Sequence, residues 1–349
     1  MPLGLHTTEL NFETTKEIGQ EGKNSQVFLA HDKQLDGEIV VKKIEKSKIV
    51  NPTEYYEEAK KLYASSHSNV VKVNYGCSDA DHIYIAMPYY KNGSLKSLIA
   101  TKNLTIREII RYSIQFLSGL HHIHSKGLIH FDVKPDNILI SDSDEAHLSD
   151  FGLTKAMNSF GFASPEQIYS KQVPPETFTS SDKTIHFDIY LAGLTIYRLL
   201  NGEEHFHQQL HSFKTQDDYI NAITSGAFPN RSDYLPHIPL KLQRVVNKAM
   251  NVNISDRHQT VLELINELSD IDENLDWRFT QTSTIHSWTR DNGAHTYKVQ
   301  VDLSNSKNIS TLTTKTNNTT SKTQRETAHC HNNLTTSNVL SKIKQALKL

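Results

Sequence analysis

The sequence predicts an α+β protein in which a strand-rich part is followed by a helix-rich part and then by a small β-rich module. Short β-type patterns broken by turns fill roughly the first ninety residues. After Asn92-Gly93-Ser94 the apolar residues recur with helical spacing, and beyond residue 272 the chain returns to β-type alternation. A strand-rich lobe packed against a helix-rich lobe leaves a cleft between them, which is a usual place for a ligand.

The strand-rich part is predicted to hold one helix among its strands. Residues 54–66 carry glutamates early and a mixed face, which indicates a helix. Glycine-containing turns separate the β-type runs around it. The predicted strands are 12–18, 26–31, 38–44, 70–76 and 82–88.

The helix-rich part contains the longest helical pattern of the chain, over residues 106–125. Thr105 stands directly before this pattern and is followed by Glu108, which is typical of a helix N-terminus, and Gly127 follows its end. The other predicted helices are 94–100, 187–201, 215–225, 239–250 and 259–268.

The chain after residue 272 is predicted to fold as a β-meander followed by a helix. Asp291-Asn292-Gly293 between two strand-like runs is a strong hairpin signal. The alternative is a Thr/Ser/Asn-rich disordered tail with a terminal helix, but the hairpin and two tryptophans favour a folded module. The strand-like runs are 277–280, 284–290, 295–303, 309–315 and, with weak alternation, 319–329, and the helix is 338–349.

Bulk properties exclude several classes of protein. A net charge of −2 gives no general attraction for nucleic acid or anionic lipid. The two cysteines, Cys77 and Cys330, lie far apart, so a disulfide framework is not indicated and a reducing cytosol is the natural compartment. Neither a signal peptide nor an apolar run long enough for a membrane span is apparent. We therefore expect a cytoplasmic protein that binds no nucleic acid and no membrane.

Two short runs carry residue types suited to phosphoryl transfer. They read His130-Phe-Asp-Val-Lys-Pro-Asp-Asn137 and Asp150-Phe-Gly152. A carboxylate such as Asp132 can orient and deprotonate an alcohol, and a cation such as Lys134 can neutralise a transferring phosphoryl group. Amide and carboxylate oxygens, here from Asn137 and Asp150, are ligands for Mg²⁺ held against ATP oxygens.

These motifs and their order resemble the eukaryotic-type Ser/Thr protein kinase family over residues 11–272. The resemblance implies a bilobal protein-kinase-like fold, with an N-lobe at about 11–90 and a C-lobe at about 91–272. Residues 1–10 are then an N-terminal extension and residues 273–349 an additional module of unknown role. It also implies transfer of the γ-phosphoryl group of ATP, with Mg²⁺ or Mn²⁺, to Ser/Thr hydroxyls of protein substrates.

The resemblance assigns the phosphate-binding groups of the first lobe. The run from Gly19 to Val27 resembles a Gly-rich loop, in which Gly19 and Gly22 let the backbone approach phosphates. Its spacing is one residue longer than the family pattern, and Ser25 replaces a third glycine. Lys42 ends a run that resembles the third-strand motif, and Glu58 is its implied helix partner.

The resemblance also implies an adenine pocket. Met87 falls at the gatekeeper position, and the backbone of Tyr90 is the implied hydrogen-bond donor because Pro88 lacks an N–H. The implied apolar walls of this pocket are Val27, Val40 and Leu139.

One residue departs from the common family pattern. Phe131 stands where most such kinases carry an arginine that a phosphorylated activation loop can neutralise. Phe131 cannot play that part, so we expect activity that does not depend on phosphorylation of this loop. Ser159 aligns with a family hydroxyl that bridges the catalytic Asp and Lys, and Thr154 is the other hydroxyl within reach.

Several further positions have structural roles in the family. Ala163-Ser-Pro-Glu166 resembles the Ala-Pro-Glu motif, so Glu166 is expected to be buried against Arg257. Residues 130–137 correspond to the catalytic loop of the family, and Asp188 is expected to anchor the backbone of this loop. Asp136 lies where some relatives recognise a basic residue upstream of the acceptor.

Histidines near the catalytic loop raise the alternative of a metal site. His121, His122 and His124 stand at the end of a predicted helix, where histidines more often pack or complement the helix dipole. The run 329–331 alternates as a strand does, which places its two histidines on one face without further ligands.

Three functions are compatible with these residues to different degrees. The first is an active Ser/Thr protein kinase. The second is a pseudokinase or nucleotide-binding scaffold whose C-terminal module carries the interaction function, which the irregular Gly-rich loop and Phe131 would suit. The third, a small-molecule kinase of related fold, fits less well because the run 163–166 and the helices after it resemble protein kinases. In every case the module after residue 272 is a candidate for regulator or substrate docking.

Overall fold

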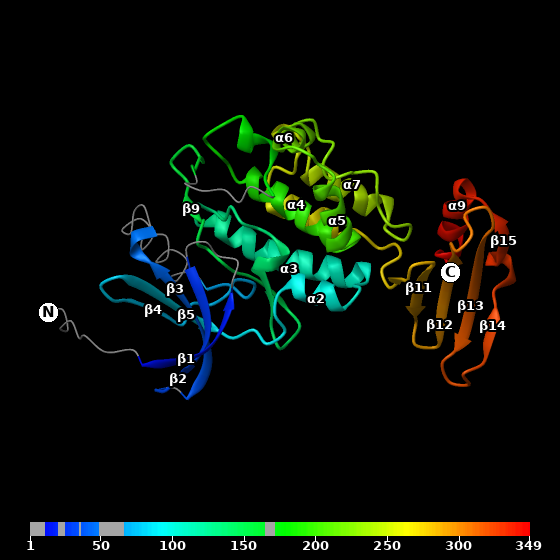
Figure 1. The fold of residues 1–349 in the computed structure, drawn as a ribbon, viewed down its shortest axis with the longest axis horizontal. Coiled ribbons are helices and arrows are strands. Elements are labelled where there is room, and N and C mark those ends of the chain that lie inside the picture. Colours follow the sequence, from blue (N-terminus) through cyan, green and yellow to red (C-terminus); the bar gives the residue numbers. More distant parts are fainter. Residues whose placement is uncertain (1–10, 20–24, 35, 49–65, 165–171) are drawn as a thin grey trace.

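The computed structural model describes residues 11–19, 25–34, 36–48, 66–164 and 172–349. Three parts follow one another in space: an N-terminal sheet, a helical part and a second sheet with its own helix (Figure 1). The predicted α+β class, with a strand-rich lobe, a helix-rich lobe and a β-rich module, is confirmed. Within the described residues, no helix is both long and apolar enough to cross a membrane.

The N-terminal sheet is antiparallel, and its two faces have different neighbours. Ala30, Ile39, Val41 and Ala86 form a small buried cluster on one face. Because side chains alternate along a strand, Lys42 lies on the opposite face. The strands are β1 (Phe12–Gly19), β2 (Ser25–Asp32), β3 (Gly37–Glu45), β4 (Tyr75–Ser78) and β5 (His82–Pro88), hydrogen-bonded in the order β1-β2-β3-β5-β4.

The structure departs from one prediction for this lobe and does not describe the residues of another. The strand predicted over 70–76 is wrong for most of its length, because the ladder begins only at Tyr75 and Val70 forms an isolated bridge with Leu148. Residues 54–65 of the predicted helix lie outside the described residues, and so does Glu58 within them.

The helical part is built around α3 and α4. Thr105 caps α3 through a capping box, in which the Thr105 side chain accepts from Glu108 N and the Glu108 side chain accepts from Thr105 N. In α4 every residue from Phe187 to Leu200 is buried, as expected for a helix in the centre of a core. The helices are α2 (Leu95–Thr101), α3 (Ile106–Ser125), α4 (His186–Asn201), α5 (Glu203–His211), α6 (Gln216–Thr224), α7 (Leu240–Ala249) and α8 (Val261–Ser269).

Helix α5 was not predicted from the sequence. It starts directly after Gly202, whose φ of 87° ends α4. Phe206 is its only buried residue, so the polar, histidine-rich sequence gives no apolar stripe.

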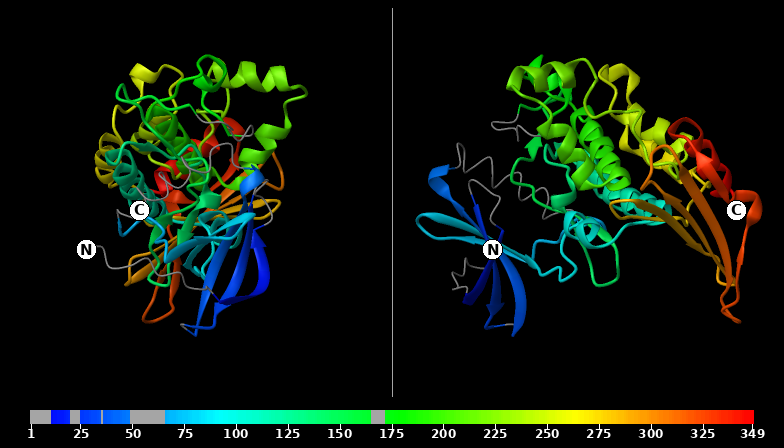
Figure 2. Two further views of the ribbon diagram at one scale, coloured as in Figure 1. Left: turned by 90° about the vertical axis from the view of Figure 1, so that its left-hand side faces the viewer. Right: turned by 45° about the vertical axis from the view of Figure 1, so that its right-hand side comes forward.

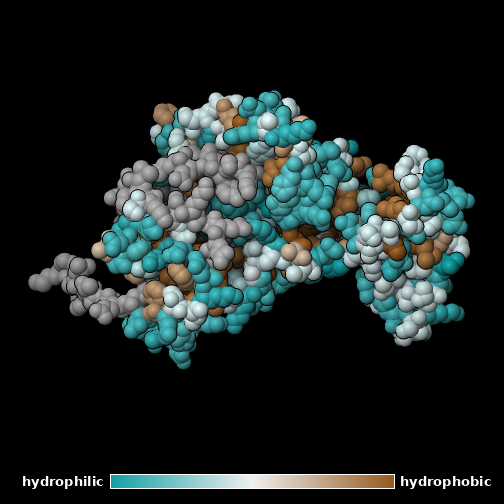
Figure 3. Space-filling view, in the orientation of Figure 1, coloured by the Kyte–Doolittle hydropathy of each residue, from teal (hydrophilic) through white to brown (hydrophobic). Residues whose placement is uncertain are grey.

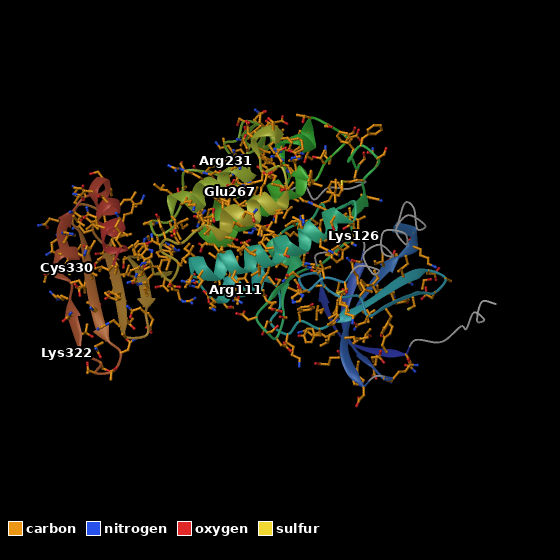
Figure 4. All side chains as sticks on the ribbon, turned by 180° about the vertical axis from the view of Figure 1, so that it is seen from behind. Arg111, Lys126, Arg231, Glu267, Lys322 and Cys330 are labelled. Atoms are coloured by element: carbon orange, nitrogen blue, oxygen red, sulfur yellow. The ribbon has the colours of Figure 1, made fainter. Side chains whose placement is uncertain are left out.

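Short strands between α3 and α4 carry the loops of the candidate site. Strand β6 (Leu128–Ile129) pairs with β9 (Lys155–Ala156), and β7 (Ile138–Ile140) pairs with β8 (Ala146–Leu148). The 3₁₀ turn η2 (Pro135–Asn137) leads directly into β7. Arg111 of α3, which is labelled in Figure 4, binds the Asp144 carboxylate at 2.6 Å in the turn between β7 and β8.

The C-terminal module is a folded antiparallel sheet with a helix, and the disordered-tail alternative is wrong. The predicted hairpin at Asn292-Gly293 joins two paired strands, and Gly293 adopts a φ of 84°. Trp277 and Trp288 are fully buried in the core of the module. Its elements are β10 (Arg278–Gln281), β11 (Ile285–Asp291), β12 (His295–Asp302), β13 (Ile309–Asn317), β14 (Thr323–Arg325), β15 (His331–Leu334) and α9 (Thr336–Ala346).

The module lies against the helical part, on the side away from the N-terminal sheet (Figure 2). Trp288 donates its indole N–H to His237 Nδ1 at 3.1 Å, and Phe279 stacks on the same imidazole. Arg107 at the start of α3 binds Asp276 through two hydrogen bonds of 2.6 and 3.0 Å. Hydrophobic residues gather where the two parts meet, whereas the outer surfaces are mostly hydrophilic (Figure 3).

Candidate active site

Asp132, Lys134 and Asn137 converge in the loop between β6 and β7. Asp132 Oδ2 accepts from Asn137 Nδ2 at 2.7 Å and pairs with Lys134 Nζ at 3.0 Å. The Asn137 amide also donates to the Asp132 carbonyl at 2.9 Å, which closes the loop on itself. Within the described part of the chain, Asp132 Oδ1 accepts no hydrogen bond. One carboxylate oxygen is therefore fixed, and the other can accept a proton.

Lys42 and Asp150 bring the two lobes together. Lys42 projects from β3 and forms an ion pair with Asp150 Oδ1. Burial alone would raise the pKa of the Asp150 carboxyl, but Lys42 and the backbone N–H of Gly152 outweigh burial and lower the pKa to about 2. A Cβ at position 152 would lie 3.2 Å from Asp150 Oδ1 and 3.3 Å from Lys42 Nζ, so glycine leaves this pair uncrowded.

Asp188 binds the backbone of the catalytic loop. It is fully buried at the start of α4, and its two oxygens accept from the backbone N–H groups of His130 and Phe131, both at 2.8 Å. His124 Nε2 lies 2.8 Å from the same carboxylate. Phe131 has a φ of 68°, a conformation that bulky side chains rarely adopt. Such strain persists where surrounding contacts hold it, and here Asp188 supplies them.

His130 couples the catalytic loop to the Asp-Phe-Gly turn. Its Nδ1 accepts from Asp132 N at 3.2 Å, so Nε2 carries the proton and donates to the Ser149 carbonyl at 3.0 Å. The ring also meets Phe151 edge-on, with centroids 5.3 Å apart. These contacts fix the backbone beside Asp132 and Asp150 and so orient their side chains.

Phe131, which stands where most relatives carry an arginine, is buried in an apolar environment. Its side chain is 2% exposed and meets Phe187 edge-on at a centroid distance of 5.1 Å. Strand β9, the first part of the segment that follows Asp150, is already paired with β6. Met157 N also donates to the Gly127 carbonyl at 2.8 Å.

One prediction about this segment is wrong. Ser159 does not bridge Asp132 and Lys134, because it lies exposed in a turn that Asn158 closes with Phe162. Thr154, the other candidate hydroxyl, is 1% exposed, and its Oγ1 has no hydrogen-bond partner among the residues that the structure describes.

The predicted pairing of Glu166 with Arg257 is also wrong. Arg257 binds both carboxylate oxygens of Glu176, at 2.8 and 2.7 Å, so its guanidinium is already satisfied. Glu166 itself lies outside the described residues. Glu176 stands in the turn η3 (Pro175–Phe178), where Pro174-Pro175-Glu176 matches the Ala-Pro-Glu pattern as well as residues 163–166 do. A second Pro-Glu step ten residues further on was the signal that could have identified it.

Three of the residues assigned to the adenine pocket, Val27, Val40 and Met87, lie on the face of the N-terminal sheet that carries Lys42. Val27 pairs with Lys42, and Val40 pairs with Met87 across neighbouring strands. Leu139 lies between two buried isoleucines of β7 and therefore points the other way from them. Burial raises the pKa of the Tyr90 hydroxyl to about 12. Gly19 pairs with Val27 at the end of β1, and Gly22 lies outside the described residues.

The donor set fits a magnesium ion. Asn137 directs its amide nitrogen at Asp132, which leaves the Asn137 carbonyl oxygen as a ligand. Asp150 is ionised over the whole physiological range because of its low pKa. Hard oxygen ligands in small number suit Mg²⁺, which takes the rest of its shell from phosphates and water.

The histidines near the loop have structural contacts. His124 binds Asp188, as described, and His122 stacks on His67 with centroids 4.9 Å apart. These contacts agree with packing roles.

Comparison with known proteins identifies the family. Residues 12–275 match the family described as protein kinase domain, and the chain therefore belongs to the protein kinase family. The chain is 28% identical over 269 residues to a probable serine/threonine-protein kinase PknB of Lactococcus lactis, a match that covers 74% of this chain and 41% of the relative.

Two further relatives agree with this family. The serine/threonine-protein kinase PknD of Protochlamydia amoebophila is 26% identical, with 74% of this chain and 30% of that protein covered. The serine/threonine-protein kinase PrkC of Bacillus subtilis is 26% identical, with 77% and 42% covered. The chain thus spans less than half of the length of each of these three relatives.

Proposed function

We propose that this chain is a serine/threonine protein kinase that transfers the γ-phosphoryl group of ATP to protein hydroxyls with Mg²⁺. The observation that carries the proposal is the convergence of Lys42 and Asp150 from the two lobes beside the cluster of Asp132, Lys134 and Asn137. A scaffold that only binds a nucleotide has no physical need for a carboxylate held with one open oxygen beside a cation. The relatives named as serine/threonine kinases support the same activity.

The chain's own groups divide the chemistry among them. Asp132 Oδ1 accepts the proton of the acceptor hydroxyl, while Asn137 and Lys134 hold Oδ2 in place. Lys134 also neutralises charge on the transferring group, and Lys42 orients the phosphates. Asn137 and Asp150 would hold Mg²⁺, which draws the phosphate oxygens together and lowers the charge barrier to attack. Glu58 is proposed as the helix partner of Lys42, as the family pattern implies.

We also propose that activity does not require phosphorylation of the segment after Asp150. Phe131 offers no cation for a phosphate, and its ring completes an apolar contact with Phe187. The pairing of β9 with β6 supports a segment that is ordered without a phosphate. Thr154 is too deeply buried to be reached by another kinase without unfolding.

The test is phosphoryl transfer from labelled ATP to a general Ser/Thr substrate, with matched lysine variants. Asp132→Asn and Lys42→Met should each lower the rate at least about a hundredfold, the size expected for loss of a general base or of phosphate orientation. Lys43→Met is the control, because Lys43 lies on the other face of β3 and should keep its activity. Equal rates for the wild type and both active-site variants would refute the proposal, and a wild type that binds ATP without transfer would favour the scaffold alternative.

Dependence on phosphorylation is tested on the same protein. Treatment with a phosphatase should leave the initial rate unchanged, and so should Ser159→Ala. A loss of activity that phosphatase causes and ATP preincubation restores would overturn this part of the proposal.

The C-terminal module is proposed as the place where a regulator or substrate docks. Its core is separate from that of the kinase part, yet Trp288 and Arg278 tie it firmly to His237 and Glu108. A partner bound there would be held at a fixed position relative to the catalytic loop. Deleting residues 273–349 should therefore reduce phosphorylation of the physiological protein substrate more than that of a short peptide.

A further inference from the structure

Asp136 lies beside the candidate active site. It is in η2, four residues after Asp132, and the next residue, Asn137, binds Asp132 directly. Four residues of chain span at most about 14 Å. A peptide with its hydroxyl at Asp132 therefore carries its neighbouring residues within reach of the Asp136 carboxylate.

Both oxygens of Asp136 already face cations of the protein itself. Lys96 Nζ of α2 lies 2.6 Å from Oδ1, and Arg198 Nη2 of α4 lies 3.8 Å from Oδ2. Burial raises the pKa of Asp136, but Lys96, Arg198 and Lys134 together outweigh burial and lower it. The carboxylate is ionised, and its charge is balanced from inside the chain.

Arg198 is buried and is held by several hydrogen bonds. Its side chain is 1% exposed, and it binds both oxygens of Glu203, at 2.7 and 2.6 Å, and Gln172 at 2.6 Å. The Lys96 side chain is 38% exposed. Two carboxylates, Asp136 and Glu203, thus face two cations, Lys96 and Arg198. Among these four side chains, Lys96 is the most exposed.

We propose that Lys96 determines the sequence preference of this kinase by occupying the carboxylate that a basic substrate residue would otherwise bind. The inference rests on the function proposed above. An incoming arginine or lysine would have to displace Lys96, which exchanges one charge-assisted hydrogen bond for another and gains little. The protein therefore phosphorylates Ser/Thr sites without selecting a basic residue close to the acceptor.

Removal of the Lys96 charge should create the missing preference. In Lys96→Met the Oδ1 of Asp136 loses its cation while Arg198 still faces Oδ2. A substrate arginine or lysine at the matching position then gains one charge-assisted hydrogen bond. That gain corresponds to a rise of about tenfold in kcat/KM for basic over neutral peptides.

The experiment is a degenerate peptide library with a fixed Ser/Thr acceptor, phosphorylated by the full chain. Each flanking position carries arginine, lysine or alanine in turn. The wild type and Lys96→Arg, which keeps the cation, should show ratios near one at every position. Lys96→Met should show the rise at one flanking position. Lys102→Met is the matched control, because Lys102 follows the same helix and pairs with Glu108 at 2.8 Å, away from Asp136.

Two results would overturn the inference. One is a wild type that already selects a basic residue strongly near the acceptor. The other is an active Lys96→Met protein with the preference of the wild type. If thermal unfolding shows that Lys96→Met is not folded, Lys96→Gln keeps an N–H donor without the charge and should show the same gain, and an unchanged profile there refutes the idea. Absence of any phosphoryl transfer by the wild type would instead refute the proposed function, so the two failures are distinguishable.

Discussion

Trp288 of the C-terminal module donates its indole N–H to Nδ1 of His237 in the helical part, at 3.1 Å and away from solvent. The hydrogen bond requires a neutral imidazole, because Nδ1 must carry a lone pair. His237 thus provides a buried polar contact between the module and the helical part. The contact between the two parts therefore depends on the protonation state of His237.

The same interface contains charged pairs on the outside. Arg278 of β10 pairs with Glu108, whose carboxylate also completes the capping box of α3. Leu235 packs against the cores of both parts. A buried centre with charged pairs around it indicates that the two parts unfold together. Because His237 lies in that centre, the stability of the interface should depend on pH.

We predict that stability falls as the pH decreases from about 6.5 to about 4. Burial lowers the pKa of His237 to about 4, below its ordinary value of 6.5. The unfolded chain then binds the proton more readily, so stability is complete above pH 6.5 and is lost as the pH falls toward 4. The effect is about 3 kcal/mol at most, from the linkage relation of 1.36 kcal/mol per pKa unit. Urea unfolding at pH 7.5 and pH 5 measures it.

The comparison needs variants that remove the titration. His237→Gln should be less stable at pH 7.5 yet lose less stability on acidification than the wild type. His211→Asn, at an exposed position, should follow the wild type at both pH values. An acid sensitivity that is the same in His237→Gln would show that other groups cause it.

Local patterns predicted most of the elements, and the residues proposed for catalysis converge in the loop between β6 and β7. The runs 106–125 and 82–88 coincide with α3 and β5, because each has a clear period and clear end signals. Helix α5 was missed since it lacks an apolar stripe and follows α4 without a loop. Glu58 and Gly22 remain predictions, because they lie outside the described residues.

Long-range pairings could not be predicted in the same way. The sequence offers two Pro-Glu steps, and only the three-dimensional position of Arg257 selects Glu176. The Lys96–Asp136 contact and the Trp288–His237 contact join residues 40 and 51 positions apart. A helix or strand does not bring residues with these separations together, so the periodicity of the sequence could not predict either contact.

Restoring the common arginine should damage this protein. Phe131→Arg would place a cation at a position that is 2% exposed and packed against Phe187, with no phosphate to neutralise it. We expect a loss of about 3 kcal/mol or more in the free energy of unfolding, the size typical of an unpaired buried charge, and a lower rate of phosphoryl transfer. Thermal and urea unfolding measure the first, and labelled ATP the second.

Phe131→Leu provides the matched comparison. It keeps the site apolar and should cost about 1–2 kcal/mol through the lost ring contact. A Phe131→Arg protein that is as stable as the wild type, or that gains activity on phosphorylation, would contradict the proposal that apolar packing of Phe131 replaces a contact with a phosphate.

The last prediction distinguishes the two Pro-Glu steps. Glu176 is buried and receives two hydrogen bonds from Arg257, which is itself 2% exposed. Removing the carboxylate in Glu176→Ala leaves a buried guanidinium without its partner, so we expect a loss of about 3–5 kcal/mol in the free energy of unfolding. Glu166→Ala should leave this pair intact and cost far less. Urea denaturation of the two variants measures the difference. A larger loss of unfolding free energy in Glu166→Ala than in Glu176→Ala would show that Arg257 pairs with Glu166 instead.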